Sequence, residues 1–329
     1  MAGSTSTWVM LEQKGAGPGA RSSHAITLVG GTAYSFGGEF TPRVPVDSTM
    51  YAFDLKAQSW TALDGATGEV PPPRVGVTMA SVGGTVFVFG GRDKDHKELN
   101  ELYSFDTATN TWTLLSSGDD GPPHRSYHSM VADAEGSRVY VFGGCGNAGR
   151  LNDLWAYDAA AGRWEELPSP GEACPPRGGP GLAFAGGKVW VVHGFSGSAE
   201  LDDVHSYDPA TGEWAAVETT GDRPAPRSVL CAAGVGKHVV VFGGEVDPSD
   251  LGHLGAGKFS AEAFILDTET GVWAKLDDAS ESDHHPGPRG WCAFSAGALD
   301  GRSGMLVYGG NSPTNDRLDD MFLFTPLLA

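Results

Sequence analysis

The sequence is poor in three features that would each point to a definite class of protein: basic residues, long hydrophobic runs and closely spaced cysteines. It has 22 Lys and Arg against 41 Asp and Glu, which gives a formal net charge of −19. Binding to a nucleic-acid backbone needs clustered cations, and so does binding to an anionic membrane surface. No hydrophobic run approaches the roughly 20 residues of a membrane helix. We therefore expect neither nucleic acid nor membrane as a partner.

The cysteines are few, lie far apart and form no C-x-x-C pair. They are Cys145, Cys174, Cys231 and Cys292. This spacing argues against a disulfide framework or a zinc knuckle and favours reduced intracellular thiols. The opening residues, MAGSTSTW, have neither the basic nor the apolar segment of a signal peptide. These features predict a cytoplasmic protein, with the nucleus as a second location.

Glycine and proline are abundant instead. The 48 Gly and 21 Pro residues indicate many tight turns between short strands. A length of 329 residues would suit roughly two or three average domains, but closed all-β folds often use such a length for one. With 40% hydrophobic residues the chain can bury a large core. We therefore predict a single all-β domain over residues 1–329.

A short apolar run that ends in a glycine pair recurs along the chain. Its copies are YSFGG (34–38), VFVFGG (86–91), VYVFGG (139–144), VVVFGG (239–244), LVYGG (306–310) and the degenerate VWVVHG (189–194), where His193 replaces the first glycine. A Pro-rich turn that closes on Arg precedes each copy, at Arg21, Arg74, Arg125, Arg177, Arg227 and Arg289. An aromatic strand and then a Trp follow every copy except the last in the chain, LVYGG (306–310). These tryptophans are Trp60, Trp112, Trp164, Trp214 and Trp273. Six copies at roughly 50-residue spacing match the kelch signature, in which each repeat is one four-stranded blade of a β-propeller.

The last repeat lacks its final strand. After the glycine pair at 309–310 comes the strand MFLF (321–324), and no Trp strand follows it. The missing strand is present at the other end of the chain, where TWVMLEQ (7–13) carries Trp8 before the first Arg turn. We therefore predict a six-bladed kelch β-propeller whose ring is closed by the N-terminal strand, since an unclosed ring would leave exposed strand edges.

The antiparallel strand order places the candidate functional residues on one face. The Arg turns begin the innermost strand of each blade and the glycine pairs end the second, so both lie at the same mouth of the ring, with the variable loops that follow the pairs. A residue that recurs in every blade favours a structural role, and we expect the six arginines to bind Asp residues such as Asp54 or Asp106. Arg92 occurs in one loop only and cannot be explained in this way.

The longest of these loops, GGEVDPSDLGHLGAG (243–257), is acidic. Asp247-Pro248 matches a helix start with Asp247 as N-cap, so the carboxylates could simply serve one helical turn. Asp250 and His253 are three residues apart and would share a face of that turn. Together with Glu245 they form a set of two carboxylates and one imidazole with open positions, which suits Fe(II). Both interpretations remain open from the spacing alone.

Several segments beyond the repeat consensus resemble the plant specifier proteins, that is, the epithiospecifier, nitrile-specifier and thiocyanate-forming proteins of glucosinolate breakdown. The similarity covers the full length and includes LEQKG and RSSH (11–24), FGGR (89–92), HSM (128–130), YDPAT (207–211), VETTG (217–221), VGK (235–237), FGGE (242–245), LDTET (266–270) and RGW (289–291).

The resemblance implies a chemistry for the mouth of the ring. In that family a Glu-x3-Asp-x3-His motif after a glycine pair holds Fe(II), which matches Glu245 and His253 here, while the middle Asp falls on Ser249. Asp250, the next residue, would then have to supply the missing carboxylate. The family's substrate-contacting residues match Arg92, which would hold a sulfate, and the aromatic residues Tyr127 and Trp291. Arg92 and Trp291 are thereby the expected catalytic residues.

Two functions of different classes follow. The first is an Fe(II)-dependent, lyase-like specifier protein that directs a thiohydroximate sulfate aglucone, released by a myrosinase-type glucosidase, to nitriles, epithionitriles or thiocyanates. The second is a kelch binding module derived from that family, which grips a protein or small ligand without chemistry. The serine at position 249 favours the second and the other matches favour the first. A closed ring has no unpaired edge, so we expect a monomer or a weak homodimer.

Overall fold

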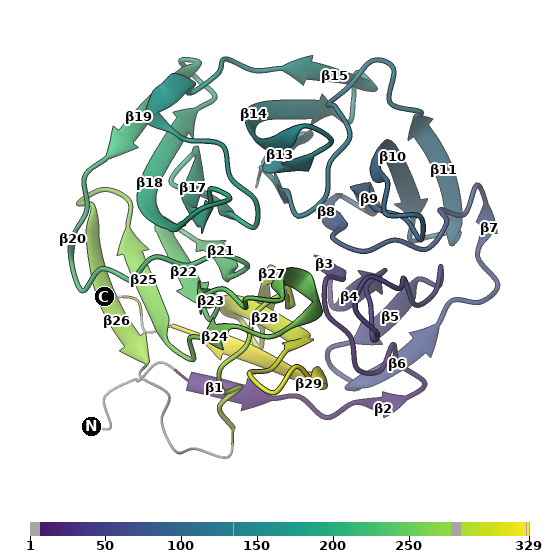
Figure 1. The fold of residues 1–329 in the computed structure, drawn as a ribbon. Coiled ribbons are helices and arrows are strands. Elements are labelled where there is room, and N and C mark those ends of the chain that lie inside the picture. Colours follow the sequence, from purple (N-terminus) through teal and green to yellow (C-terminus); the bar gives the residue numbers. More distant parts are fainter. Residues whose placement is uncertain (1–6, 134, 278–283, 327, 329) are drawn as a thin grey trace.

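The computed structural model describes residues 7–133, 135–277, 284–326 and 328. They form six twisted antiparallel sheets arranged around a central axis (Figure 1). The prediction of an all-β six-bladed kelch propeller is confirmed. Within these residues no helix has the length and apolar character needed to cross a membrane. The signal-peptide expectation concerned mainly residues 1–6, which lie outside the described part of the chain.

Each sheet has four main strands, from the innermost beside the axis to the outermost at the rim. Blades 1 and 2 consist of β3 (Ala25–Val29), β4 (Thr32–Phe36), β5 (Tyr51–Asp54) and β6 (Ser59–Ala62), and of β8 (Thr78–Val82), β9 (Thr85–Arg92), β10 (Glu98–Asp106) and β11 (Thr111–Ser116). Blades 3 and 4 consist of β12 (Ser129–Ala132), β13 (Arg138–Gly146), β14 (Gly149–Asp158) and β15 (Arg163–Glu166), and of β16 (Gly181–Ala185), β17 (Lys188–Phe195), β18 (Glu200–Asp208) and β19 (Glu213–Val217). Blades 5 and 6 consist of β21 (Cys231–Val235), β22 (His238–Phe242), β25 (Ala263–Asp267) and β26 (Val272–Asp277), and of β27 (Ala293–Leu299), β28 (Arg302–Asn311), β29 (Arg317–Thr325) and β1 (Thr7–Met10).

Several short strands and turns lie outside the four main strands of each blade. Three two-residue strands lie parallel to the outer strands of blades 1, 2 and 5, namely β2 (Lys14–Gly15), β7 (Thr67–Gly68) and β20 (Thr220–Gly221). The long loop of blade 5 forms a separate hairpin of β23 (Glu245–Asp247) and β24 (Lys258–Phe259). Two short 3-10 turns lie in loops, η1 (Gly171–Ala173) and η2 (Gly252–Leu254).

The N-terminal strand closes the ring as predicted. In Figure 1, β1 runs along the outer edge of blade 6 beside β29, and Trp8 pairs with Phe324. The Trp8 ring lies 4.5 Å from the Phe324 ring and 4.7 Å from that of Phe242 in blade 5. Its indole thus fills the wedge between two blades, the place that the repeat gives to the Trp of every other blade.

The core lies between the blades. The middle strands read as nearly continuous apolar runs because a neighbouring blade covers each of their faces. In β22, for example, the residues from Val239 to Phe242 are all buried. Trp190 of blade 4 packs in the same cluster as Val241 and Trp273 of blade 5. The ring is therefore held together by these apolar layers between sheets.

The six recurring arginines are buried and act structurally, but their partners differ from those expected. Arg125 is fully buried and its guanidinium binds both carboxylate oxygens of Asp153 at 2.7 Å, together with the carbonyl of Gly143 at 3.0 Å. The corresponding pairs are Arg21–Asp47, Arg74–Glu101, Arg177–Asp203, Arg227–Glu262 and Arg289–Asp320.

The expectation that residues such as Asp54 or Asp106 bind these arginines is wrong. Both carboxylates lie at turns and accept backbone N–H groups, Asp54 from Lys56 and Ala57 and Asp106 from Ala108. An Asp side chain at a turn satisfies its own loop in this way. The true partners lie at or near the start of the third strand of each blade, the end that faces the mouth.

Candidate functional site

Six residues, one from each blade, form a closed backbone ring at the mouth of the channel. Each lies two positions after a recurring arginine, and the members are Ser23, Gly76, Tyr127, Gly179, Val229 and Trp291. The N–H group of each donates to the carbonyl of the preceding member at 2.8–3.2 Å, and Ser23 closes the circle by donating to Trp291. All six have φ between 49° and 62°, a left-handed conformation that costs Val and Trp far more than Gly. We call this the mouth ring.

Four members of the mouth ring, Tyr127, Gly179, Val229 and Trp291, line a cavity of about 190 Å³, the mouth cavity. Its wall includes Tyr127, Arg150, Glu245, Ser249, His253 and Trp291. The imidazole of His253 stacks on the Tyr127 ring, at 5.2 Å between centroids and 17° between planes, and lies edge-on to Trp291 at 6.2 Å. The long loop of blade 5 therefore reaches across the ring to blades 3 and 6.

Two of the predicted donors of the long loop reach the mouth cavity and one does not. Glu245 is buried in β23 and His253 lies in η2. Asp250 is exposed and does not line the cavity. Ser249 does line it, and its hydroxyl accepts the N–H of Leu251 at 3.1 Å.

The predicted helix start at Asp247 is also absent. Asp247 ends β23 and its exposed carboxylate lies 3.4 Å from the ammonium of Lys258 in β24. The hairpin pairing of β23 with β24 satisfies this backbone in place of a cap. The helical turn begins only at Gly252, so the carboxylates of the loop do not serve a helix terminus.

Glu245 is a buried acid with an unsatisfied oxygen. Its backbone bridges to Ser228 in both directions, at 2.8 and 3.0 Å, which fixes the residue on the blade. Its Oε2 atom is buried and has no hydrogen-bond partner. Burial, followed by the nearby carboxylate of Glu200 in blade 4, raises the pKa of Glu245 to about 8. Glu245 is thus mostly protonated and neutral at pH 7.

Arg92 lies beside the site but is already paired. Its guanidinium donates to Oε1 of the buried Glu98, with the Nε contact at 3.0 Å. It also lies 5.9 Å from the centroid of the Tyr127 ring. Arg92 does not line the mouth cavity. Its charge is therefore largely balanced by Glu98, and its guanidinium lies over the face of the Tyr127 ring.

Arg150 is the cation that lines the mouth cavity, and sequence reasoning missed it. Its guanidinium lies 5.0 Å from the Phe195 ring, and its buried Nε has no hydrogen-bond partner. In the described part of the chain no carboxylate forms an ion pair with it. One signal could have found it, because Arg150 follows a glycine pair on the mouth face. Its counterpart in blade 6 is Arg317, which is paired with Glu39.

Among the described residues, the mouth cavity is lined by one cation without an acidic partner, although the protein is strongly acidic. Burial, followed by the charges of Arg92, Arg43 and Arg150, lowers the pKa of His253 to about 4. His253 is therefore neutral at pH 7, as is most of Glu245. The unpaired charge of Arg150 is left facing a partly desolvated cavity, where an electrostatic interaction is stronger than in water. The arrangement suits a small anion with an apolar or planar body.

An iron ion would find two of its expected donors here. Glu245, with its unsatisfied oxygen, and His253 both line the mouth cavity. Across the described residues, no three His, Cys, Asp or Glu side chains are gathered closely enough to form a ready-made metal site. The residues therefore fit Fe(II) only if water or substrate completes the ligand set, and binding would have to displace the proton of Glu245.

Comparisons with known proteins agree with the kelch fold over about two thirds of the chain. The family model of the KLHDC2/KLHL20/DRC7 Kelch-repeats domain matches residues 23–244. Partial matches include Tip elongation aberrant protein 1 of Schizosaccharomyces pombe, 34% identical over 46% of this chain and 14% of that protein. Another is Kelch domain-containing protein 3 of Bos taurus, 32% identical over 39% of this chain and 32% of that protein.

One relative matches this chain over nearly the full length of both sequences. The chain is 40% identical to the N-(sulfonatooxy)prop-2-enimidothioate sulfolyase of Thlaspi arvense over 96% of each sequence. A match of this length includes every blade and the long loop of blade 5, in contrast to the partial kelch matches. The chain therefore belongs to the family of plant kelch-repeat specifier proteins.

Proposed function

We propose that this protein binds a sulfated thiohydroximate at the mouth cavity and directs its breakdown with loss of sulfate, as a lyase-like specifier protein. The observation that carries the proposal is Arg150, a guanidinium without a carboxylate partner in a cavity whose other ionisable groups are neutral at pH 7. The name of the Thlaspi arvense relative, a sulfolyase of an N-sulfonatooxy imidothioate, gives the substrate class.

In this proposal each residue at the mouth cavity has a distinct role. Arg150 binds the sulfate group and stabilises the negative charge that grows on it as the N–O bond breaks. A guanidinium matches the oxygen geometry of a sulfate, as it does that of phosphate. Tyr127 and Trp291 pack against the organic body of the substrate and exclude water. Arg92, oriented by Glu98, supports the face of Tyr127.

The proposal includes Fe(II) with Glu245 and His253 as the protein donors. A bound Fe(II) would supply Lewis-acid and electron-transfer chemistry, and no further protein nucleophile is required. The substrate would come from a myrosinase-type glucosidase, which the protein need not contact. Nitriles, epithionitriles and thiocyanates are the proposed products.

The direct test is a product assay. We expect that the Fe(II)-loaded protein, incubated with a myrosinase and an allyl glucosinolate, shifts part of the product from isothiocyanate to nitrile, epithionitrile or thiocyanate. Replacing Arg150 by Gln removes a charged hydrogen bond and should weaken binding of a sulfate ester roughly 10- to 100-fold. Gas chromatography measures the products, and calorimetry with methyl sulfate measures the binding.

The matched control is Arg163→Gln, the same substitution at an exposed position of blade 3. It should change neither the products nor the affinity. If isothiocyanate is the sole product with the iron-loaded protein, the specifier proposal is wrong. If Arg150→Gln and Arg163→Gln bind methyl sulfate equally well, Arg150 is not the anion site.

The serine at position 249 favours a second candidate, a non-catalytic binding module. We expect Ser249→Asp to raise the affinity for Fe(II) roughly tenfold or more, because it adds a charged oxygen ligand next to the two donors that line the cavity. Anaerobic equilibrium dialysis with iron analysis measures this. Asp250→Asn is the control, since Asp250 is exposed and away from the cavity. Equal iron binding in the parent and Ser249→Asp would show that position 249 is no ligand, and an absence of iron in both would favour the binding module.

A further inference from the structure

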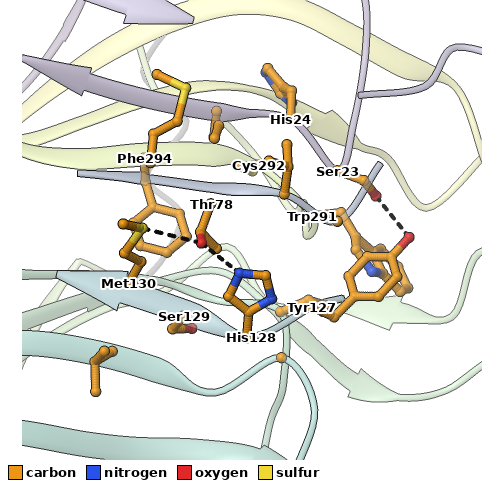
Figure 2. Close-up of a pocket in the computed structure, with 18 of the residues that line it drawn as sticks. Ser23, His24, Thr78, Tyr127, His128, Ser129, Met130, Trp291, Cys292 and Phe294 are labelled. Atoms are coloured by element: carbon orange, nitrogen blue, oxygen red, sulfur yellow. Dashed lines mark hydrogen bonds between the residues drawn. The ribbon is translucent and has the colours of Figure 1, made fainter. Parts of the chain in front are cut away.

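A second cavity of about 100 Å³, the channel cavity, lies inside the propeller behind the mouth ring. Figure 2 shows Tyr127 and Trp291 together at one end of it and Met130 and Phe294 at the other. Four members of the mouth ring line both cavities, namely Tyr127, Gly179, Val229 and Trp291. The two cavities are therefore neighbours that share the mouth ring as their boundary.

The wall of the channel cavity is mainly apolar. It is lined by Ile26, Met79, Met130, Leu182 and Phe294 from the innermost strands of five blades. Its polar lining includes Ser23, His24, Thr78, His128 and Ser129. Thr78 and Nε2 of His128 share a 2.7 Å hydrogen bond that is drawn in Figure 2. Nε2 of His128 also contacts the carbonyl oxygen of Phe89 at 3.0 Å.

The channel cavity therefore offers no charge to a ligand. Burial, followed by the charge of Arg125, lowers the pKa of His128 to about 3, and burial, followed by the charge of Arg21, lowers that of His24 well below its usual value. Both imidazoles that line the cavity are therefore neutral at pH 7. A charged or strongly polar group would lose its hydration on entering and gain little in return. An apolar group would gain by leaving water.

Two members of the mouth ring have no side chain, and neighbouring residues fill the space that a Cβ atom would need there. Gly76 and Gly179 are the members without a Cβ atom. A Cβ at Gly76 would lie 3.1 Å from the Tyr127 ring, and one at Gly179 would lie 2.7 Å from the Val229 side chain. The missing side chains thus leave room for the side chains of Tyr127 and Val229, and the Tyr127 hydroxyl lies 3.3 Å from that of Ser23.

We propose that the channel cavity is a specificity pocket that receives the apolar side chain of an organic sulfate whose charged end is held by Arg150 in the mouth cavity. The proposal rests on the proposed anion site and adds the part that selects among substrates. Its volume corresponds to on the order of three groups the size of a water molecule. The pocket therefore favours short, unbranched aliphatic chains, with Tyr127 and Trp291 flanking the junction of chain and head group.

The test uses n-alkyl sulfates from methyl to hexyl as stable probes, with calorimetry on the full-length protein. In the parent we expect the affinity to rise about fourfold for each added methylene, up to about three or four carbons, and then to level off. Met130→Trp fills the cavity and should abolish the rise from methyl to butyl sulfate. Phe294→Ala enlarges the cavity and should extend the rise to longer chains, which keeps the test informative if Met130→Trp does not fold.

The controls separate this inference from the anion site. Met10→Trp makes the same exchange on an exposed residue of β1 and should leave the series unchanged. Arg150→Gln should weaken all members of the series alike and keep the rise with chain length. An affinity independent of chain length, or a rise that neither Met130→Trp nor Phe294→Ala alters, overturns the channel pocket while leaving the anion site in place. A parent protein that binds no alkyl sulfate overturns both.

Discussion

Replacing Arg125 by Met is expected to lower the free energy of unfolding by about 3–5 kcal/mol, because it removes one partner of a buried ion pair. The Arg125 side chain holds three groups of its own blade, Asp153 and the carbonyls of Pro123 and Gly143. Its backbone is bonded to Leu99 and Gly91 of the preceding blade. The substitution leaves these side-chain partners without their donor at the junction of two blades.

The size of the loss should depend on pH in a predictable way. Burial raises the pKa of Asp153, but the hydrogen bonds and charge of Arg125 outweigh it, so the pKa lies below its usual value. A carboxylate with a lowered pKa contributes stability above its unfolded pKa, and this stability is lost as the pH falls through the folded pKa. The difference between parent and Arg125→Met should therefore shrink as the pH is lowered toward 3.

Guanidinium chloride unfolding followed by tryptophan fluorescence measures both effects. Arg163→Met is the matched control, since Arg163 lies exposed in β15 of the same blade. It should change the free energy of unfolding by less than about 0.5 kcal/mol. Equal losses in the two variants, or a loss in Arg125→Met that is the same at every pH, would contradict the assigned role of the Arg125–Asp153 pair.

The fold could be predicted from the sequence almost completely. Every blade repeats the Arg turn and the Trp, and all but blade 4 repeat the full glycine pair, so six copies of a weak pattern together predict the fold clearly. Trp8 also revealed the closing strand, because its place in the repeat was vacant at the other end of the chain. The partners of the arginines could not be predicted in this way. They lie near variable loops and are Asp in some blades and Glu in others, as in Asp153 and Glu101.

The candidate site was predicted only in part, for a physical reason. Tyr127, Glu245, His253 and Trp291 come together at one cavity. The sequence could not show that Arg92 is neutralised by Glu98, six residues further on in the facing strand. The direction of a side chain in an irregular loop depends on the local backbone, which residue spacing does not fix.

The second large expected effect is a loss of folding stability at acidic pH. The imidazoles of His24, His128 and His193 are buried, and burial, followed by a neighbouring arginine, lowers the pKa of each. Each binds a proton in the unfolded chain near pH 6.5 but in the folded protein only at a lower pH. Unfolding therefore takes up protons in this range, and the stability should fall as the pH drops from 6.5 toward 4. Glu200 and Glu245 act in the opposite sense, because their pKa values are raised to about 7 and 8.

His193→Gly tests the contribution of one of these histidines, because it restores the glycine that all five other repeats have at this position. The residue has φ = 58°, which suits glycine, and its pKa is lowered to about 4. Removing the His193 imidazole should flatten the slope of the free energy of unfolding against pH between 4 and 6.5, by up to about 1.4 kcal/mol per pH unit. The matched control is His96→Gly, the same substitution at an exposed residue with φ = 61°, which measures the effect of glycine on the backbone alone. If the two variants have equal slopes in denaturant unfolding at a series of pH values, the buried imidazole is not a source of the acid sensitivity. A flatter slope in His193→Gly alone would show that the repeat tolerates a histidine at this position only while the imidazole stays neutral.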